Sequence, residues 1–365
     1  MGLSTKKILG VNISIASNSK VLEEVGKYFK TKNQEPRTKN KNLVKPLIIY
    51  TPNPEIIVYA QKDSEFKRIV NSAQINIADG AGVVWAVRKI YGDKIKKVSG
   101  VDLMFDLCDL ASNQGLTVGL IGGSEEVAVA TAECLSRKYR NLRVEVFQAP
   151  EIILNEKEKV AGSEYSRIGG IHDAVDAHSS QTASGQGESL KKINKLTTNY
   201  LILNTGNPQS EETNKYFNDL VEDITHKNID VLFVAFGFPK QEYFIAQIAR
   251  TMNQEPPVPV GTGQARTKNK NISSKYSVLS SKLPSKPLVL MAVGGAFDYI
   301  SGKKTRAPMW MREIGLEWLY RLIREPSRLL RQLRGAEFFY KILKQFKAIQ
   351  PSNSTSGVDY TVLAG

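Results

Sequence analysis

Short apolar runs alternate along this chain with longer segments in which apolar residues recur at helical spacing. The short runs predict strands, at positions 46–50, 75–78, 117–121, 142–147, 200–204, 230–236 and 288–293. The longer segments predict amphipathic helices, at 55–73, 82–90, 101–113, 125–139, 214–227 and 241–250. Strands that alternate with helices indicate an α/β fold with a mostly parallel sheet, in which ligands bind at the carboxyl ends of the strands.

Three polar stretches, near 31–42, 166–198 and 253–286, interrupt this alternation. The first and third share the tracts NQEP and RTKNKN, and the second is rich in Ser, Gly, Gln and Lys. Such stretches hold too few apolar side chains to offset the entropy lost on ordering. We therefore expect mobile surface insertions in a core spanning 1–302, and a flexible tail at 348–365.

The segment 303–347 combines basic side chains with aromatic and aliphatic ones. It holds twelve Lys and Arg against four Glu, a local net charge of +8 in a chain whose total is +14. Arg321, Arg328 and Arg331 fall on one side of a helix if that helix continues through Pro326. A basic helix with an apolar stripe suits an anionic membrane surface or a diphosphate. We expect a basic, amphipathic helical appendage here, which associates with a membrane or binds a diphosphate.

Charge and composition narrow the class of protein. A net charge of +14 indicates a polyanionic partner, namely nucleic acid, anionic lipid or a phosphorylated substrate. Cys108 and Cys134 lie in apolar helical patterns, which predicts buried free thiols in a reducing compartment. The chain begins without a secretory apolar region, and its apolar runs are too short to span a bilayer. We predict a cytoplasmic protein that is at most peripheral to a membrane.

Polar residues that the fold alone does not require follow the first two predicted strands. Thr51 and Asn53 can present a hydroxyl and an amide to a sugar, although this loop alone favours Asn53 as the cap of the next helix. Asp79 stands before Gly80, where a carboxylate can act as a general base or merely form a turn.

Two later strands also end in polar or Gly-rich loops. Gly122 and Gly123 open a helix whose amides can hold a phosphate, although a plain tight turn explains them equally. This incomplete glycine pattern gives no case for a nicotinamide cofactor. Lys240 and Gln241 begin a helix after VLFVAFG, where Lys opposes the helix dipole. Either a ligand or a polar surface turn accounts for this pair.

Several common catalytic motifs are missing from the sequence. It contains no D-x-D, H-E-x-x-H, C-x-x-C or G-x-S-x-G, and only three His. Metal or nucleophilic chemistry based on histidine is therefore not expected. We predict neither a metal site nor a cofactor.

Seven motifs, in one order, resemble those of the TagA/WecG/CpsF glycosyltransferases (glycosyltransferase family 26). They are TPNPE at 51–55, ADGAGVVWA at 78–86, VSGVDL at 98–103, LIGGSEEV at 120–127, FGFPKQE at 236–242, AVGGAFDYISG at 292–302 and RAPMWMREIGLEWLYRLIREPSRLLR at 306–331. The resemblance covers the chain apart from the polar insertions and the C-terminal tail.

This resemblance implies a bacterial enzyme with a Rossmann-like α/β core, peripheral on the inner face of the cell membrane. Such an enzyme transfers an N-acetylmannosamine-type sugar from UDP to a polyprenyl-diphosphate-linked N-acetylglucosamine, with inversion and without a metal, in cell-surface polysaccharide synthesis. The implied partners are a UDP-sugar donor, the lipid-linked acceptor, an anionic membrane surface and further copies of the chain. The family's appendage closes the active site at the membrane, where an oligomer becomes monomeric.

The resemblance also assigns roles to residues near the strand ends. The family's catalytic base falls on Asp79. Its substrate-orienting polar residues fall on Thr51, Asn53 and Gln241.

Positive charge for the departing diphosphate is implied as well. The family's C-terminal arginines match Arg321, Arg328 and Arg331. The family often has Arg where this chain has Lys97, which keeps the charge but lacks the bidentate fork of a guanidinium. Among the appendage aromatics, we expect Trp318 to pack between helices and Phe338 and Phe339, near Lys341 and Lys344, to contact the membrane.

Two other classes of protein stay open. The net charge is also typical of a nucleic-acid-binding α/β protein, and the strand–Gly loop–helix unit is typical of a nucleotide-dependent oxidoreductase. Much of the excess charge lies in the insertions and in the lipid-suited appendage, so nucleic acid is not expected as a partner. The incomplete glycine pattern argues against the oxidoreductase.

Overall fold

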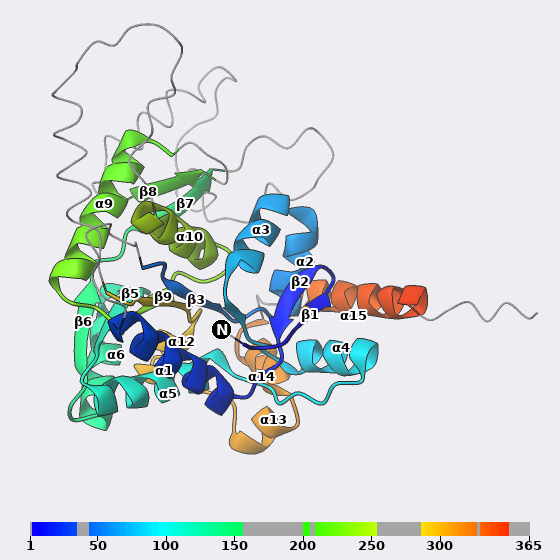
Figure 1. Ribbon diagram of the computed structural model, residues 1–365. Coiled ribbons are helices and arrows are strands. Elements are labelled where there is room, and N and C mark those ends of the chain that lie inside the picture. Colours follow the sequence, from blue (N-terminus) through cyan, green and yellow to red (C-terminus); the bar gives the residue numbers. More distant parts are fainter. Residues whose placement is uncertain are drawn as a thin grey trace, which may run out of the picture.

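The computed structural model describes residues 2–34, 44–155, 200–204, 209–253, 286–326 and 329–349. The three predicted insertions and the C-terminal tail lie almost wholly outside these ranges, so their conformation stays a prediction. Within the described residues the chain forms a central sheet flanked by helices (Figure 1).

Six parallel strands form the sheet, in the order β4-β3-β10-β9-β5-β6. They are β3 (Leu47–Tyr50), β4 (Ile75–Asn76), β5 (Thr117–Gly122), β6 (Arg143–Phe147), β9 (Val231–Ala235) and β10 (Val289–Ala292). The register continues across the centre, where Met291 lies opposite Ile49 on one side and Phe233 on the other. All six coincide with predicted strands, which confirms the mostly parallel α/β fold.

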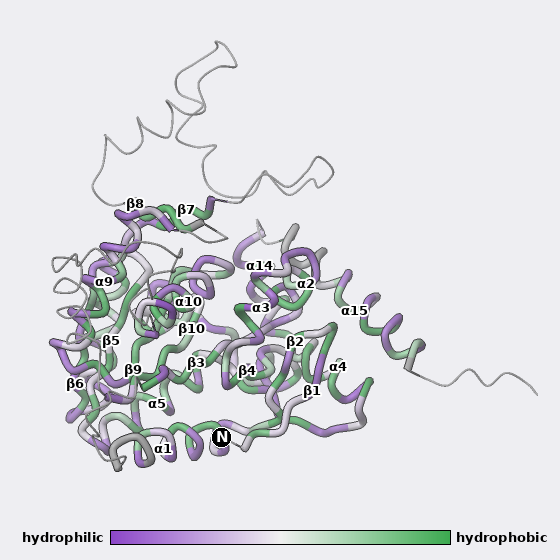
Figure 2. Tube along the Cα trace, turned by 45° about the horizontal axis from the view of Figure 1, so that its top comes forward, coloured by the Kyte–Doolittle hydropathy of each residue, from purple (hydrophilic) through white to green (hydrophobic). Residues whose placement is uncertain are grey.

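Both faces of the sheet are buried. Along β9, Leu232 and Val234 join one hydrophobic core, whereas Val231 and Phe233 join the other. Because both faces are covered, the central strands β3, β10, β9 and β5 are apolar runs rather than alternating ones, whereas the edge strand β6 is partly exposed. Figure 2 shows the central strands running between the helices. The first core is covered by α2 (Pro54–Lys62), α3 (Ser64–Ser72), α9 (Glu211–His226) and α10 (Lys240–Asn253), and the second by α1 (Asn18–Gln34), α5 (Gly100–Gln114), α6 (Glu125–Lys138) and α12 (Ala296–Ile300).

Some elements differ from those that the sequence predicts. The predicted strand at 200–204 is β8 (Tyr200–Asn204), which pairs only with the unpredicted strand β7 (Glu151–Asn155), outside the main sheet. An antiparallel hairpin of β1 (Thr5–Ile8) and β2 (Val11–Ser14), and helix α1, were not predicted either. Both cysteines are free thiols as predicted, although only Cys108 is fully buried.

The single helix predicted over 55–73 is two helices. Asp63 separates α2 from α3, and its carboxylate accepts a hydrogen bond of 2.9 Å from the Phe66 amide, which caps α3. An aspartate that bonds the backbone in this way favours a helix start over a helix interior.

Three helices form the C-terminal appendage: α13 (Met309–Glu313), α14 (Glu317–Arg324) and α15 (Leu329–Ile349). The three arginines would share one side only in a helix that continues through Pro326. That helix does not form, because α14 ends at Arg324 and α15 begins only at Leu329. Proline lacks the amide hydrogen and disfavours a helical residue before it. Arg321 and Arg331 therefore lie on different helices; Arg328 and the Arg331 side chain lie outside the described part of the structure.

Helix α15 packs along α2 and α4 (Ala81–Tyr91), and extends away from the sheet (Figure 1). Phe338 is fully buried in the first core, so its predicted membrane contact is wrong; Phe339 is 41% exposed. Trp318, expected to pack between helices, is instead 47% exposed. None of the described helices combines the length and apolar character that crossing a membrane requires.

Candidate active site

The residues predicted at strand ends come together along one edge of the sheet. Thr51 follows β3, Asp79 lies shortly after β4, Gly122 ends β5, and Gln241 lies in the first turn of the helix after β9. The Asp79 amide donates a hydrogen bond of 3.2 Å to the Pro52 carbonyl, which ties the first two loops to each other. The carboxyl ends of parallel strands meet at a common edge, where such folds bind ligands.

Asp79 has the electrostatic environment of a base. Its side chain is partly buried, and within the described ranges no hydrogen bond or ion pair holds its carboxylate. Burial raises the pKa of Asp79 to about 6; the charges of Arg321, Lys97 and Arg306 act to lower it, and that of Glu317 to raise it. A carboxylate with this pKa is mostly ionised at neutral pH, yet it binds a proton more readily than an ordinary aspartate.

Glu317, the first residue of α14, links two of the predicted phosphate-binding cations. One carboxylate oxygen lies 3.0 Å from Lys97 Nζ, and the other lies 2.7 Å from Arg321 Nη2. Burial raises the pKa of Glu317, but the charges of Arg321 and Lys97 outweigh it and hold the pKa below its usual range. Lys97 and Arg321, far apart in the sequence, are thus brought together by a glutamate that sequence reasoning did not single out.

A second ion pair connects the appendage to α5. Arg306 forms a bidentate pair with Asp102, with N–O distances of 2.5 and 2.9 Å, and its Nη2 also donates to Ser99 Oγ at 2.9 Å. Burial raises the pKa of Asp102, but the hydrogen bond from Arg306 and the charges of Arg306, Arg312 and Lys97 together outweigh it, and the pKa lies below its usual range. Asp102 lies in the motif at 98–103 and Arg306 in the motif at 306–331. These two motifs are the feature of the sequence that marks the two residues.

The appendage touches the core directly beside Asp79. Gly315 has a φ of +82°, and a Cβ added there would lie 2.8 Å from Ala81 Cβ. A Cβ added at Gly82 would lie 3.4 Å from Phe339 Cζ. Only glycine suits the Gly315 position, because both the left-handed backbone and the close approach exclude a side chain.

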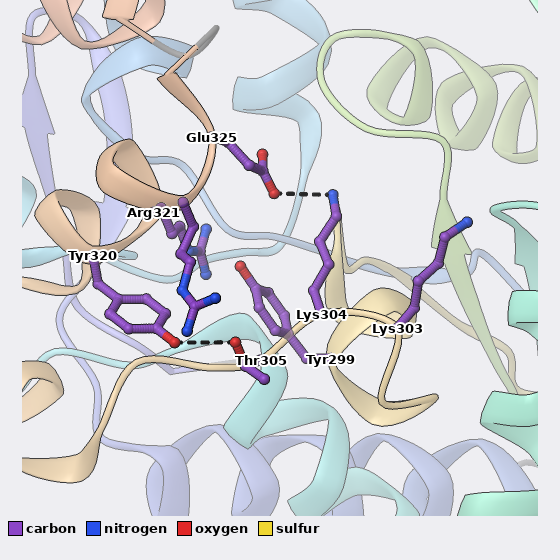
Figure 3. A pocket seen from close by; sticks show the side chains of 8 residues that line it. Tyr299, Lys303, Lys304, Thr305, Tyr320, Arg321 and Glu325 are labelled. Atoms are coloured by element: carbon purple, nitrogen blue, oxygen red, sulfur yellow. Dashed lines mark hydrogen bonds and ion pairs between the residues drawn. The ribbon is translucent and has the colours of Figure 1, made fainter.

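A basic cavity of about 280 Å³ opens between α12 and α14 (Figure 3). It is lined by Tyr299, Lys303, Lys304, Thr305, Tyr320, Arg321, Arg324 and Glu325. The Arg321 guanidinium lies 5.1 Å from the centre of the Tyr299 ring, and Tyr320 forms a 3.0 Å hydrogen bond with Thr305. Four cations against one carboxylate make this cavity suitable for an anion. A second hollow, of about 540 Å³, is lined by three glutamates of α6 and does not suit one.

Three arginines of the appendage have an unsatisfied donor, and one of them, Arg321, lines this cavity. The buried Nε–H groups of Arg306, Arg312 and Arg321 have no hydrogen-bond partner within the described structure. Buried donors are normally paired, so an anionic ligand with several acceptor oxygens would complete this part of the site. No three His, Cys, Asp or Glu side chains of the described residues are grouped so that they could hold a metal ion.

Thr51 and Asn53 have structural partners in the first loop. Asn53 Oδ1 accepts a 2.9 Å hydrogen bond from the Ile56 amide, which confirms the helix-capping alternative. Thr51 is 8% exposed, and a Cβ added at Gly100 would lie 3.3 Å from its methyl group. The Asn53 amide nitrogen and the Thr51 hydroxyl are the groups that a substrate could still contact.

The tight-turn alternative explains the Gly122–Gly123 pair. Gly122 has a φ of +108°, and a Cβ there would lie 2.6 Å from the Ala235 carbonyl carbon. The Gly123 amide donates to the Ala235 carbonyl at 3.0 Å, so in this arrangement it is already used. Because Gly122 has no side chain, the end of β5 can lie directly against the end of β9 at Ala235.

Gln241 is not part of a polar surface turn, because it is only 3% exposed. Its Oε1 accepts from the Gly294 amide at 2.9 Å, and its Nε2 donates to Glu242 Oε1 at 2.9 Å. Gln241 thus ties the ends of β9 and β10 to each other. Burial raises the pKa of Glu242 to about 7, and its Oε2 has no partner in the described structure.

Comparison with known proteins agrees with this geometry. The model of the Glycosyl transferase WecG/TagA/CpsF family matches residues 6–219, 205–266 and 278–352. Two curated N-acetylglucosaminyldiphosphoundecaprenol N-acetyl-beta-D-mannosaminyltransferases, from Staphylococcus aureus strains MRSA252 and MW2, are each 24% identical over 343 residues, which cover 94% of this chain and 94% of each relative. The chain therefore belongs to the WecG/TagA/CpsF family and is a glycosyltransferase.

Proposed function

We propose that this protein transfers an N-acetylmannosamine-type sugar from UDP to a polyprenyl-diphosphate-linked N-acetylglucosamine, with inversion and without a metal ion. The observation that carries the proposal is Asp79, a carboxylate of raised pKa without an ion-pair partner in the described structure, at the strand ends beside a cluster of cations. The two Staphylococcus aureus relatives are named as transferases of N-acetylmannosamine to N-acetylglucosaminyldiphosphoundecaprenol, which supports the proposal.

The proposed chemistry is a single displacement. The acceptor hydroxyl oxygen forms a bond to the anomeric carbon while the bond from that carbon to the UDP oxygen breaks. Asp79 takes the hydroxyl proton, and UDP leaves with the bonding electrons. Attack from the face opposite to UDP inverts the anomeric centre.

Positive side chains take the role of stabilising the leaving diphosphate. Arg321 lines the basic cavity, and its charge also acts on Asp79, so one guanidinium connects the anion site with the base. Lys97 lies on the other side of Glu317. Fixed cations in a partly buried site stabilise developing negative charge without further reorganisation. Arg328 and Arg331 keep their proposed role as further diphosphate ligands.

The appendage also presents a surface suited to an anionic membrane on the inner face of the cell. Met309, Trp310, Ile314 and Ile323 are each more than 60% exposed. They lie in a segment in which cations outnumber carboxylates. Exposed apolar side chains beside cations favour the interface of an anionic bilayer, where the lipid-linked acceptor would be found.

Release of UDP tests the reaction directly. The purified protein is mixed with UDP-N-acetylmannosamine and a short-chain lipid-diphosphate N-acetylglucosamine, with EDTA in one arm and magnesium in the other. We expect release that depends on the acceptor and is equal in both arms. Release only with magnesium would contradict the metal-free mechanism, and no release with any UDP-sugar would contradict the proposed function.

The two alternative functions, a nucleotide-dependent oxidoreductase and a nucleic-acid-binding protein, fit the structure less well. A dinucleotide would need free amides in the glycine turn, but the Gly123 amide is bonded to Ala235. Nucleic-acid binding rests on the net charge alone, and much of that charge lies in the predicted insertions and in the appendage.

A further inference from the structure

Glu317 is a buried carboxylate whose two oxygens each contact a different cation. It is 9% exposed, and the contacts join α14 to the loop before α5 through Lys97, and to the next turn of its own helix through Arg321. Lys97 and Arg321 are partly exposed, and taking such charged groups partly out of water gives little net stability, because the loss of hydration offsets much of their attraction. Stability alone is therefore a weak reason for this arrangement.

The charged side chains that act on Asp79 come from three different segments of the chain. Arg321 and Glu317 act from α14, Lys97 from the loop before α5, and Arg306 from the segment before α13. Arg306 is itself paired with Asp102. Three of the four act to keep Asp79 ionised, and Glu317 is the one that opposes them.

We infer that Glu317 is a positioning residue for sugar transfer, which holds Lys97 and Arg321 beside Asp79 and offsets their charge so that Asp79 stays a usable base. The inference rests on the proposed function. Without the glutamate, two uncompensated cations would stabilise the Asp79 carboxylate, and a carboxylate stabilised in this way accepts a proton less readily. The same cations would also lose the contacts that fix their side chains.

The pH dependence of kcat/KM separates this role from a merely structural one. Glu317→Gln keeps the size of the side chain but removes its charge. We expect the acid limb of the profile to move to lower pH by at least about half a unit, because a like charge next to Asp79 is gone. Glu337→Gln is the matched control: Glu337 forms ion pairs with Lys62 and Lys341 in the same appendage, away from Asp79, and its loss should leave the midpoint in place. A midpoint that stays in place or rises in Glu317→Gln would overturn the inference.

A second variant keeps the test informative if Glu317→Gln loosens α14. Lys97→Met leaves the Glu317–Arg321 pair but removes one cation, so the acid limb should move to higher pH. Opposite shifts in the two variants support the inference, and shifts in the same direction contradict it. Thermal unfolding of each variant checks that it is folded.

A readout without turnover separates this inference from the proposed function. The Asp79 carboxyl can be titrated by NMR in aspartate-labelled protein, with Asp79→Asn used for the assignment. Glu317→Gln should lower the Asp79 midpoint and Lys97→Met should raise it. Failure of the wild type to transfer sugar would refute the proposed function while this titration still decides whether Glu317 acts on Asp79.

Discussion

Two carboxyl groups at the strand ends, Asp79 and Glu242, carry raised pKa values for the same reason. Burial removes water from each, and water would otherwise stabilise the charged form. Their neighbours differ: cations surround Asp79, whereas the nearest partner of Glu242 is the Gln241 amide. Asp79 is therefore mostly ionised at neutral pH, whereas Glu242 is close to half protonated.

Asp79→Asn should abolish most of the transfer while the donor still binds. The amide occupies the same space but cannot take the acceptor proton, and loss of a general base typically lowers the rate by about 100-fold or more. Steady-state kinetics and UDP-sugar binding by calorimetry measure the two effects. Asp109→Asn, at an exposed position on α5, is the control. Full activity in Asp79→Asn would show that another group is the base.

Glu242 makes the protein less stable as the pH rises. Because its folded pKa of about 7 lies above the ordinary 4.5, the folded state holds a proton that the unfolded state releases between these values. The free energy of unfolding should fall across that window, by up to about 3 kcal/mol. Asp79 acts in the same direction below pH 6.

Glu242→Gln should remove most of this dependence, and the variant should be more stable than the wild type at pH 8. Urea unfolding at pH 5 and pH 8 measures the difference. Glu133→Gln, at an exposed position on α6, should unfold like the wild type at both values. An unchanged pH dependence in Glu242→Gln would mean that Glu242 is ionised in the folded protein.

At the scale of elements, the sequence predicts what depends on local patterns. The four central strands β3, β10, β9 and β5 are buried on both faces, so each is a short apolar run that is easily recognised. The order of strands and the position of α15 depend on contacts between distant segments, which no local pattern contains. Phe338 illustrates this, because its neighbouring lysines suggested a membrane contact while α2 and α4 bury it.

The same limit applies to the candidate site. Asp79 and Gln241 could be recognised from motifs, and both lie at the strand ends. Glu317, Arg306 and Asp102 also lie in those motifs, but their pairing could not be recognised, because only the fold shows which charged residues meet.

The contact between the α13–α14 turn and α4 should control activity. Gly315→Ala places a Cβ against Ala81 and strains a left-handed backbone, so the turn must move and carry Glu317 and Arg321 with it. We expect transfer to fall by about tenfold or more, because misplaced catalytic groups are costly to the rate. Gly335→Ala in α15, where a Cβ meets nothing within 4 Å, should retain activity. Equal activity of both variants would exclude this docking.

The two adjacent phenylalanines of α15 should differ in their effect on stability. Phe338→Ala empties a fully buried position and should lower the free energy of unfolding by about 3–5 kcal/mol. Phe339→Ala should cost much less, because Phe339 is 41% exposed and contacts chiefly Trp85, at a ring distance of 5.0 Å. Urea unfolding of both variants measures the difference, and similar losses would show that α15 is not docked as described.

At the scale of the whole molecule, we propose that the core and the appendage share one active site. Removal of every residue after Gly302 should leave a folded sheet, because both of its faces are covered by other helices. Transfer should be lost together with Arg306, Glu317 and Arg321. The melting temperature should also fall, since Phe338 and Ile342 fill part of the first core. Circular dichroism and the UDP assay test both effects, and full transfer by the truncated protein would refute the shared site.

The place of β10 in the sheet has a consequence for how the protein is made. Of the six strands it is the last in the chain, yet it lies between β3 and β9 and joins them. On the ribosome, the two-stranded unit β4-β3 and the three-stranded unit β9-β5-β6 can form before β10 emerges. They remain separate, each with an unpaired strand edge, until residues 289–292 join them. The appendage emerges later still. We therefore expect no catalysis by a nascent chain before β10 and the appendage have emerged, and a chain that stalls before β10 exposes two unpaired strand edges to its neighbours.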